Sequence, residues 1–358
     1  FLILSSIAAV ILMSMAPMNI VSDRFSKYFG EDTALRIDTD FTDENLGGLY
    51  RIEYSLDTKE PQGISNPEYL AKVEQFAQWY RSQDEVQHVN TYTDILKRLN
   101  KNLHGDDPDY YSLPDSQELS AQYLLLYELS LPFGLDLTNQ VNFDKSSTRM
   151  VVSLPSLGTP DFIDLQERGK AWLAENAPEM VQEGSGLALM FTHIGIRAMK
   201  GSIQGASMAL VLIAIVLIIS LRSLKMGLIS LIPNMLPGIA GFGVWYLFRG
   251  TVGQSMSMVL GITMGIVVDD TVHFLSKYLR ARREQGLSSE DAIRYAFASV
   301  GKALWVTTLV LVAGFIVLTF SHFKLNADMG LMTAMTITLA LLADFLFLPP
   351  LLMKLEQK

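Results

Sequence analysis

Cysteine is absent from the 358-residue chain, which excludes disulfide scaffolds, thiolate metal sites and thiol catalysis. No glycine-rich loop ends in Lys-Ser or Lys-Thr, so the sequence predicts no phosphate-binding loop and no ATP-driven pump. His88, His104 and His193 lack the spacing of metal ligands. We therefore expect no metal, no cofactor and no enzymatic activity.

The chain also has fewer basic residues than acidic ones, 28 Lys and Arg against 37 Asp and Glu. The formal net charge of −9 argues against a nucleic-acid partner, which would require a basic face on the protein. From Ile203 to Leu352, apolar blocks follow one another almost without interruption. Hydrophobic residues make up 49% of the chain and the mean hydropathy is +0.26, so we expect an α-helical membrane protein.

About 20 mostly apolar residues are needed to span a membrane as a helix. Six segments are candidates: residues 1–20, 206–221, 226–248, 255–274, 303–320 and 329–352. The sequence thus predicts a first transmembrane helix at 1–21, an extracytoplasmic porter domain at 22–200 and a five-helix bundle at 201–358. Because the chain begins in an apolar stretch with no Met or basic region, we expect it to be a piece of a longer protein.

The distribution of basic residues predicts the orientation. Ten basic residues lie in the loops after the second and fourth candidate spans and in the tail: Arg222, Lys225, Lys277, Arg280, Arg282, Arg283, Arg294, Lys302, Lys354 and Lys358. The intervening loops hold only Arg249 and Lys324. Since basic loops face the cytoplasm, the large domain is expected on the other side.

The porter domain has a mixed pattern. We expect strands at 50–56, 86–92, 150–154 and 180–183, and helices at 67–80 and 161–175. Two strand–helix–strand units favour an α+β, ferredoxin-like layer, interrupted at 94–140 by two helices around a polar loop. Between the fourth and fifth spans, Ser288 and Asp291 have the spacing of a helix cap. Residues 287–300 are therefore expected to form an amphipathic helix on the cytoplasmic membrane surface.

Three carboxylates lie inside the apolar spans, Asp269 and Asp270 in the fourth and Asp344 in the sixth. A charge at mid-bilayer costs about 2.5–3.5 kcal/mol on insertion scales, so such residues usually have a function. Counted from the outer ends of their spans at about 1.5 Å per residue, the three lie at a common depth in the inner half of the bilayer. A buried polar residue that merely joins helices is the alternative for any one of them.

Three further side chains belong to the same expected layer. His273 lies one turn from Asp269 on the same helix face, and Thr307 and Thr308 reach this depth on the fifth span. The alternatives are a histidine at the membrane boundary and threonines bonded to their own backbone. With no lysine or arginine in any span core, we expect a dry layer that loads a proton from outside and releases it to the cytoplasm.

The motifs LRSLKMGLISLIPNMLP, GITMGIVVDDTVHFLSKY, VGKALWVTTLVLVAGFIVL with FSHF, and ADFLFLPPLL resemble those of the resistance-nodulation-division (RND) superfamily. The nearest branch is the hydrophobe exporters similar to mycobacterial-membrane-protein-large and hopanoid transporters, and the spans resemble sterol-sensing domains. The resemblance implies that Asp269, Asp270 and Asp344 match the proton-relay acids of the superfamily. An intramembrane lysine of the multidrug branch has no match here.

Together these features predict a secondary transporter that uses the proton-motive force to export lipids or other hydrophobic, amphiphilic molecules. A non-transporting lipid or sterol sensor or scaffold is the first alternative, and an accessory that pulls secreted polypeptide chains is the second. The resemblance implies a C-terminal half or half-size unit in the bacterial inner membrane. Its expected partners are a missing N-terminal half or a second copy, together with a periplasmic adaptor.

Overall fold

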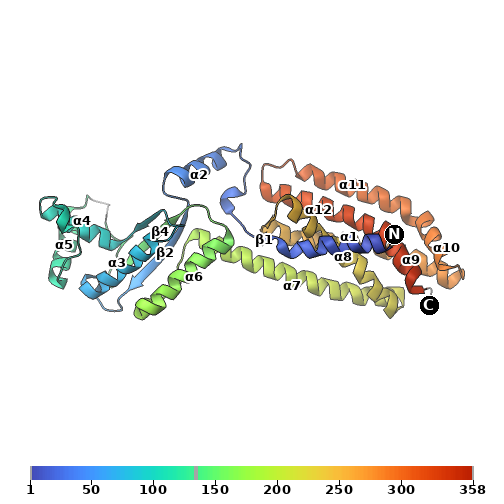
Figure 1. Cartoon of the computed structure of the whole chain (residues 1–358), viewed down its shortest axis with the longest axis horizontal. Coiled ribbons are helices and arrows are strands. Elements are labelled where there is room, and N and C mark those ends of the chain that lie inside the picture. Colours follow the sequence, from blue (N-terminus) through green and yellow to red (C-terminus); the bar gives the residue numbers. More distant parts are fainter. Residues whose placement is uncertain (1, 133–135, 357–358) are drawn as a thin grey trace. The chain divides into compact units, whose positions relative to one another are not determined.

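The computed structural model describes residues 2–132 and 136–356 (Figure 1). Phe1 and Lys358, which bound the first and last predicted segments, lie outside the described residues. The chain forms two compact units. We call Phe1–Asp23, Lys27–Thr33 and Ile194–Lys358 the membrane unit, and Arg24–Ser26 with Ala34–His193 the α+β unit.

Five described helices are long and apolar enough to cross a membrane. Three of them are single helices: α7 (Leu187–Leu221), α8 (Leu224–Phe248) and α9 (Gln254–Glu284). The fourth is a continuous run of α10 (Ser289–Ala296), the π-helical turn η6 (Phe297–Gly301) and α11 (Lys302–Leu318). The fifth is a continuous run of α12 (Lys324–Leu342), the π-helical turn η7 (Ala343–Phe347) and α13 (Leu348–Glu356). Five of the six predicted spans are therefore present at full length in the described chain.

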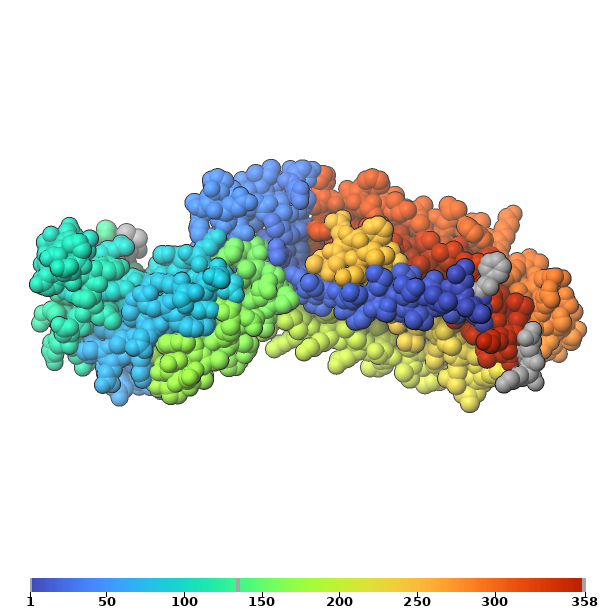
Figure 2. Space-filling view, viewed as in Figure 1, coloured from blue at the N-terminus to red at the C-terminus, as the bar shows by residue number. Residues whose placement is uncertain are grey.

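The described part of the first predicted span forms helix α1 (Leu2–Met15) and the 3₁₀ turn η1 (Ala16–Met18), which together make a shorter apolar helix than the other five. Figure 2 shows α1 in dark blue on one face of the membrane unit. It is held at its end by Asn19, whose Nδ2 donates to the Phe242 carbonyl at 2.9 Å, and by a short parallel pairing of β1 (Ile20–Val21) with β5 (Thr251–Val252).

The helices of the membrane unit differ in how much of their surface they bury. Within its most apolar 18 residues, the helical run Lys324–Leu355 buries 56% of its residues, whereas the corresponding stretch of α7 buries 11%. Helix α12 therefore lies at the centre of the bundle, and α7 presents most of its apolar side chains outward, as a lipid-facing helix does. Asp344, the buried acid of the functional site described below, lies in η7, directly after this central helix.

The predicted amphipathic segment 287–300 forms a helix that does not end where expected. Ser288 caps α10 by accepting a hydrogen bond from the Asp291 backbone N–H, which confirms the predicted cap. The apolar face of α10 packs against α9 through Ala292, Ile293 and Ala296. Because the helix continues through η6 into α11, α10 is one end of the fifth span, and its position on a membrane surface stays a prediction.

Close packing of α1 on α8 depends on Gly243, where an added Cβ would overlap the Leu12 carbonyl. We expect Gly243→Ala to lower the free energy of unfolding by about 1–3 kcal/mol. The added methyl group meets the backbone of Leu12, which cannot move aside as the end of a flexible side chain can. Gly314→Ala in α11 is the matched control, since no atom lies within 4 Å of its added Cβ. Thermal unfolding of the detergent-solubilised protein measures both. Equal unfolding temperatures for the two variants would contradict the assigned packing.

The α+β unit is built on a three-stranded antiparallel sheet in the order β2-β4-β3. Its strands are β2 (Tyr50–Asp57), β3 (His88–Asn90) and β4 (Ser147–Leu154), as predicted for three of the four expected strands, although β3 is shorter. Register pairs Tyr50 with Leu154 and Val89 with Val152. Alternate side chains of β2 are buried in the core, as a sheet covered on one face requires.

The fourth predicted strand, 180–183, is not formed. Residues Pro178–Met180 make the 3₁₀ turn η5, and only Ser185 forms an isolated bridge, to Glu53. Gly186 next to it has φ +147°, a conformation that ends the extended pairing. The described residues therefore do not confirm a ferredoxin-like fold with a four-stranded sheet.

Helices cover the sheet and extend beyond it. The predicted ones are α3 (Pro67–Arg81), α4 (Tyr92–Leu103), α5 (Gln117–Ser130) and α6 (Thr159–Asn176). Helix α2 (Ala34–Asn45) was not predicted, and single 3₁₀ turns lie at η2 (Phe25–Lys27), η3 (Gly63–Ser65) and η4 (Pro108–Tyr110). The core between sheet and helices is aromatic, and the hydroxyls of Tyr54 and Tyr80 share a buried hydrogen bond of 2.6 Å.

Charged side chains join α3 to α4. Glu74 accepts hydrogen bonds from Lys97 at 2.7 Å and from the Thr93 hydroxyl at 2.6 Å. Burial alone would raise the pKa of Glu74, but the hydrogen bonds from Lys97, Thr93 and Gln78 outweigh burial and hold the pKa below its ordinary value of 4.5. Ionised Glu74 therefore stabilises this pair of helices.

The lowered pKa sets a pH dependence. The stabilisation by Glu74 is present above pH 4.5 and is lost as the pH falls through the folded pKa, because the folded state must then take up a proton that it binds weakly. Glu74→Gln should speed hydrogen exchange of α3 and α4 amides at neutral pH, and the difference from the wild type should shrink below pH 4.5. A difference that does not depend on pH would contradict this role.

Candidate functional site

Asp344 is the most deeply buried carboxylate of the membrane unit. It is 2% exposed and lies in η7, between α12 and α13. Its Oδ1 accepts a hydrogen bond of 3.1 Å from the hydroxyl of Thr271 on α9, and its Oδ2 has no partner among the described residues. A buried acid with one oxygen held and the other open is expensive for a purely structural role and suits proton exchange.

The local sequence accounts for the π-helical turn around Asp344. Pro349 and Pro350 have no N–H to donate to the carbonyls four residues earlier, and the rings of proline crowd those carbonyls. The backbone N–H of Leu348 bonds instead to the carbonyl of Ala343, five residues back. Such widened turns occur frequently at functional sites, because they change the direction in which one side chain points.

The two adjacent carboxylates of α9 have different surroundings. Asp270 is partly buried and lies within electrostatic range of Asp344. The Asp269 side chain is 72% exposed and lies 3.5 Å, Oδ1 to Nε2, from His273, whose side chain is 61% exposed. Successive residues on a helix point about 100° apart, so the two acids cannot share one environment.

Asp269 and His273 open into a groove of about 710 Å³ between α9 and the α10–α11 run. Asp270 and Thr307 also line this groove. Apolar side chains, among them Ile266 of α9 and Leu311 of α11, form the rest of the lining. The hydroxyl of Thr307 donates a hydrogen bond of 2.9 Å to the backbone carbonyl of Ala303. This agrees with the alternative prediction that the threonine bonds its own backbone. Thr308 faces inward, 4% exposed, and its hydroxyl has no partner in the described structure.

The predicted residues are therefore arranged in two connected sets and not in one buried layer. Asp344 and Thr308 are buried, whereas Asp269, His273 and Thr307 are exposed to the groove. Asp270 lines the groove and acts electrostatically on Asp344, so it lies between the two sets. The expectation of a single dry layer is corrected in this respect, because neighbouring positions on α9 face different directions.

Thr271 is the site residue that sequence reasoning missed. It directly follows the two acids in the segment VVDDTVHF, one residue beyond Asp270. A signal was available, since Thr263, Val267 and Thr271 recur at four-residue spacing and all three are buried. Such spacing places the two threonines on one face of the helix, where their hydroxyls can meet a neighbouring helix.

Aromatic rings connect η7 to its surroundings. Phe345, next to Asp344, packs on Phe297 of η6 with ring centroids 4.7 Å apart, and Trp305 meets Phe345 edge-on at 6.0 Å. Phe297 also packs on Phe274 of α9 at 4.8 Å. The two π-helical turns of the membrane unit are thus in direct contact, one of them carrying the buried acid.

The bond from Thr271 to Asp344 can be tested by stability. Thr271→Val keeps the shape of the side chain and removes the donor, so we expect the free energy of unfolding to fall by about 0.5–1.5 kcal/mol. Thr263→Val is the control, because this equally buried hydroxyl bonds only the Val259 carbonyl. Unfolding of the detergent-solubilised variants compares the two. An equal loss would mean that the contact with Asp344 contributes nothing.

Comparisons with known proteins cover most of the chain. A family model described as the MMPL family matches residues 80–356, which include β3, β4 and all five long apolar helices. A membrane protein of Methanocaldococcus jannaschii is 25% identical over 146 residues, which are 41% of this chain and 37% of that protein. The match thus covers little more than a third of the length of that relative.

Proposed function

Because the chain belongs to the MMPL family, whose members are RND-type transporters of hydrophobic substrates, we propose that it exports lipids or other hydrophobic molecules in exchange for protons. The observation that carries this proposal is Asp344, buried in an apolar bundle and bonded to Thr271, with Asp270 in electrostatic range. A protonated and a deprotonated Asp344 differ strongly in solvation free energy, so the site can drive a change in packing.

A proton route follows from the two sets of residues. The proton is held at Asp344, passes to Asp270 and leaves through Asp269 and His273, which face the groove. Each proton that crosses 100 mV supplies about 2.3 kcal/mol, so one or two protons could reorganise helix contacts worth a few kcal/mol. Inward proton movement would accompany outward movement of the substrate.

The two π-helical turns offer a means of coupling. Loss of the proton from Asp344 demands new hydrogen-bond donors for its open oxygen, and η7 would shift to supply them or to admit water. Phe345 would transmit this shift to Phe297, and so to the α10–α11 run that forms one wall of the groove. The helices would then alternate between two packings, as the alternating-access description of transporters requires.

The multi-pass membrane location is supported by the family and the five long apolar helices. We further propose the bacterial inner membrane, with the α+β unit on the periplasmic side, because the basic loops favour a cytoplasmic position. The α+β unit would receive the substrate. A second half, supplied by a longer chain or a second copy, and a periplasmic adaptor are the proposed partners.

One observation favours a second candidate, a lipid-binding sensor. A cavity of about 260 Å³ lies among α7, α8 and α9, with apolar walls and Asn234 at its edge. Asn234 is 3% exposed, and neither its amide oxygen nor its nitrogen has a partner in the described structure. Because the amide atoms of Asn234 are covered by protein, a lipid in this cavity would be held by its apolar walls. A sensor would bind lipid without any dependence on a pH gradient, whereas a transporter would move protons.

The experiment reconstitutes the full chain in liposomes with a pH-sensitive dye inside and a fluorescent lipid analogue as cargo. Asp344→Asn and Asp270→Asn should each lower proton flux and cargo movement at least tenfold, because asparagine cannot exchange a proton. Asp328→Asn, on the same helix as Asp344 and paired with Lys324 at 2.7 Å, is the control and should retain both activities. Transport that survives Asp344→Asn would refute the proton-driven mechanism.

A further inference from the structure

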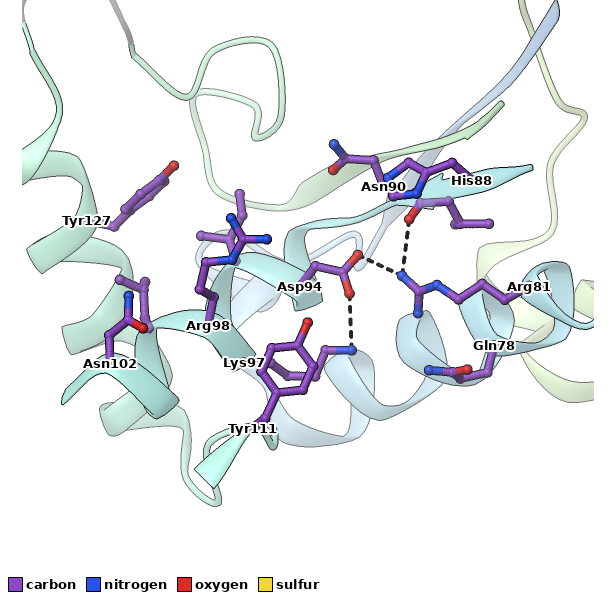
Figure 3. A pocket seen from close by; sticks show the side chains of 13 residues that line it. Gln78, Arg81, His88, Asn90, Asp94, Lys97, Arg98, Asn102, Tyr111 and Tyr127 are labelled. Carbon is purple, nitrogen blue, oxygen red and sulfur yellow. Dashed lines mark hydrogen bonds and ion pairs between the residues drawn. The ribbon is translucent and has the colours of Figure 1, made fainter. Parts of the chain in front are cut away.

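A pocket of about 540 Å³ lies within the α+β unit, where α4 and α5 stand beside β3 and the end of α3 (Figure 3). This volume is in the range of ligand-binding pockets, about 300–1,000 Å³. The lining combines cations and polar groups with tyrosine and aliphatic side chains. None of these residues takes part in the proton site of the membrane unit.

The pocket has an excess of positive charge in an acidic chain. Three of its lining side chains are cationic, Arg81, Lys97 and Arg98, and one is anionic, Asp94. Asp94 binds Arg81 at 2.7 Å and Lys97 at 3.1 Å, and Glu74, which is not part of the lining, binds Lys97 at 2.7 Å and Arg81 at 3.5 Å. Two acids therefore neutralise two of the bases, which leaves one charge uncompensated.

Arg98 carries the uncompensated charge. Its guanidinium has no ion pair or hydrogen bond within the described parts of the chain, and Figure 3 shows it between Tyr127 and the strand with His88 and Asn90. A guanidinium presents several donors in one plane and binds carboxylates or phosphates through two of them at once. The side-chain amide of Asn90, on β3, likewise has no hydrogen-bond partner among the described residues and adds a further donor to the lining.

The remaining wall is suited to an alkyl chain. Ile95 and Leu99 line the pocket beside Tyr111 and Tyr127. Lys97 lies over the ring of Tyr111, 5.3 Å from its centroid, so this ring is fixed against α4. Tyrosines with an apolar face and a polar edge commonly line the boundary between a charged head group and its hydrocarbon.

We propose that this pocket binds the head group of an anionic amphiphile, a carboxylate or phosphate joined to an alkyl chain, with Arg98 as the binding cation. The inference rests on the proposed function in one respect, because it takes the amphiphile to be the transported cargo. Binding itself requires neither a proton gradient nor an intact Asp344.

The test measures equilibrium binding to the full chain in nanodiscs of zwitterionic lipid, by dialysis against protein-free nanodiscs. Three probes share one alkyl chain: decanoate, decyl phosphate and the uncharged decanol. At least one of the two anions should bind more tightly than decanol, and the tighter anion identifies the head group. Equal binding of all three probes would overturn the proposal.

Variants assign the binding to Arg98. Arg98→Gln should weaken binding of the preferred anion about tenfold, because a charge-assisted bidentate contact is lost, and Arg98→Lys should restore part of it. Lys101→Gln makes the same charge change one turn along α4, outside the pocket lining, and should bind as the wild type does. If Arg98→Gln and Lys101→Gln weaken binding of the anion equally, the effect depends on net charge alone and the proposed site is overturned.

Asp344→Asn separates this inference from the proposed function. We expect this variant to bind the preferred anion like the wild type while transport is lost. If transport persists in Asp344→Asn but binding still depends on Arg98, the proton mechanism fails and the pocket stands. If transport depends on Asp344 but Arg98→Gln binds normally, the pocket assignment fails alone.

Discussion

A carboxylate at the centre of an apolar helix bundle must find a donor or stay uncharged, and Asp344 meets this requirement by contact with one hydroxyl. Thr271 on α9 provides the hydrogen bond, and the π-helical turn η7 turns the acid toward it. Burial of Asp344 thus ties α9 to α12 at a defined height, and the neighbouring aromatic rings fix η6 against η7. The groove with Asp269 and His273 lies on the far side of the same helix, α9.

The long apolar helices could be predicted because their hydropathy is strong and continuous. Helices α3, α4, α5 and α6 and strands β2 and β4 were also predicted, since their side chains alternate or recur with the period of the element. Helix α2 was missed because eight of its twelve residues, ALRIDTDFTDEN, are polar, so the segment did not stand out from the polar sequence around it. The strand expected at 180–183 failed because Pro178 and Gly186 restrict pairing to Ser185.

The site was predictable in composition but not in arrangement. Rare charges in apolar spans identified Asp269, Asp270 and Asp344, and helix rise placed them at similar depth. Rotation about the helix axis could not be assigned without knowing which face of α9 meets α12. The π-helical turn shifts the angular position of Asp344 further, and no pattern of apolar residues encodes this shift. Thr271, whose hydroxyl bonds Asp344, was missed although its spacing from Thr263 and Val267 on one face of α9 offered a signal.

Each π-helical turn holds one residue more than an α-helix of the same length would need. That surplus can move along the axis when successive N–H groups exchange acceptors one at a time, without any full turn of the helix coming apart. In η7 such migration would rotate Asp344 and Phe345 about the axis while the ends of the span stay at nearly the same height. Such a shift would leave the large apolar surface of the last span in place while one side chain changes neighbours.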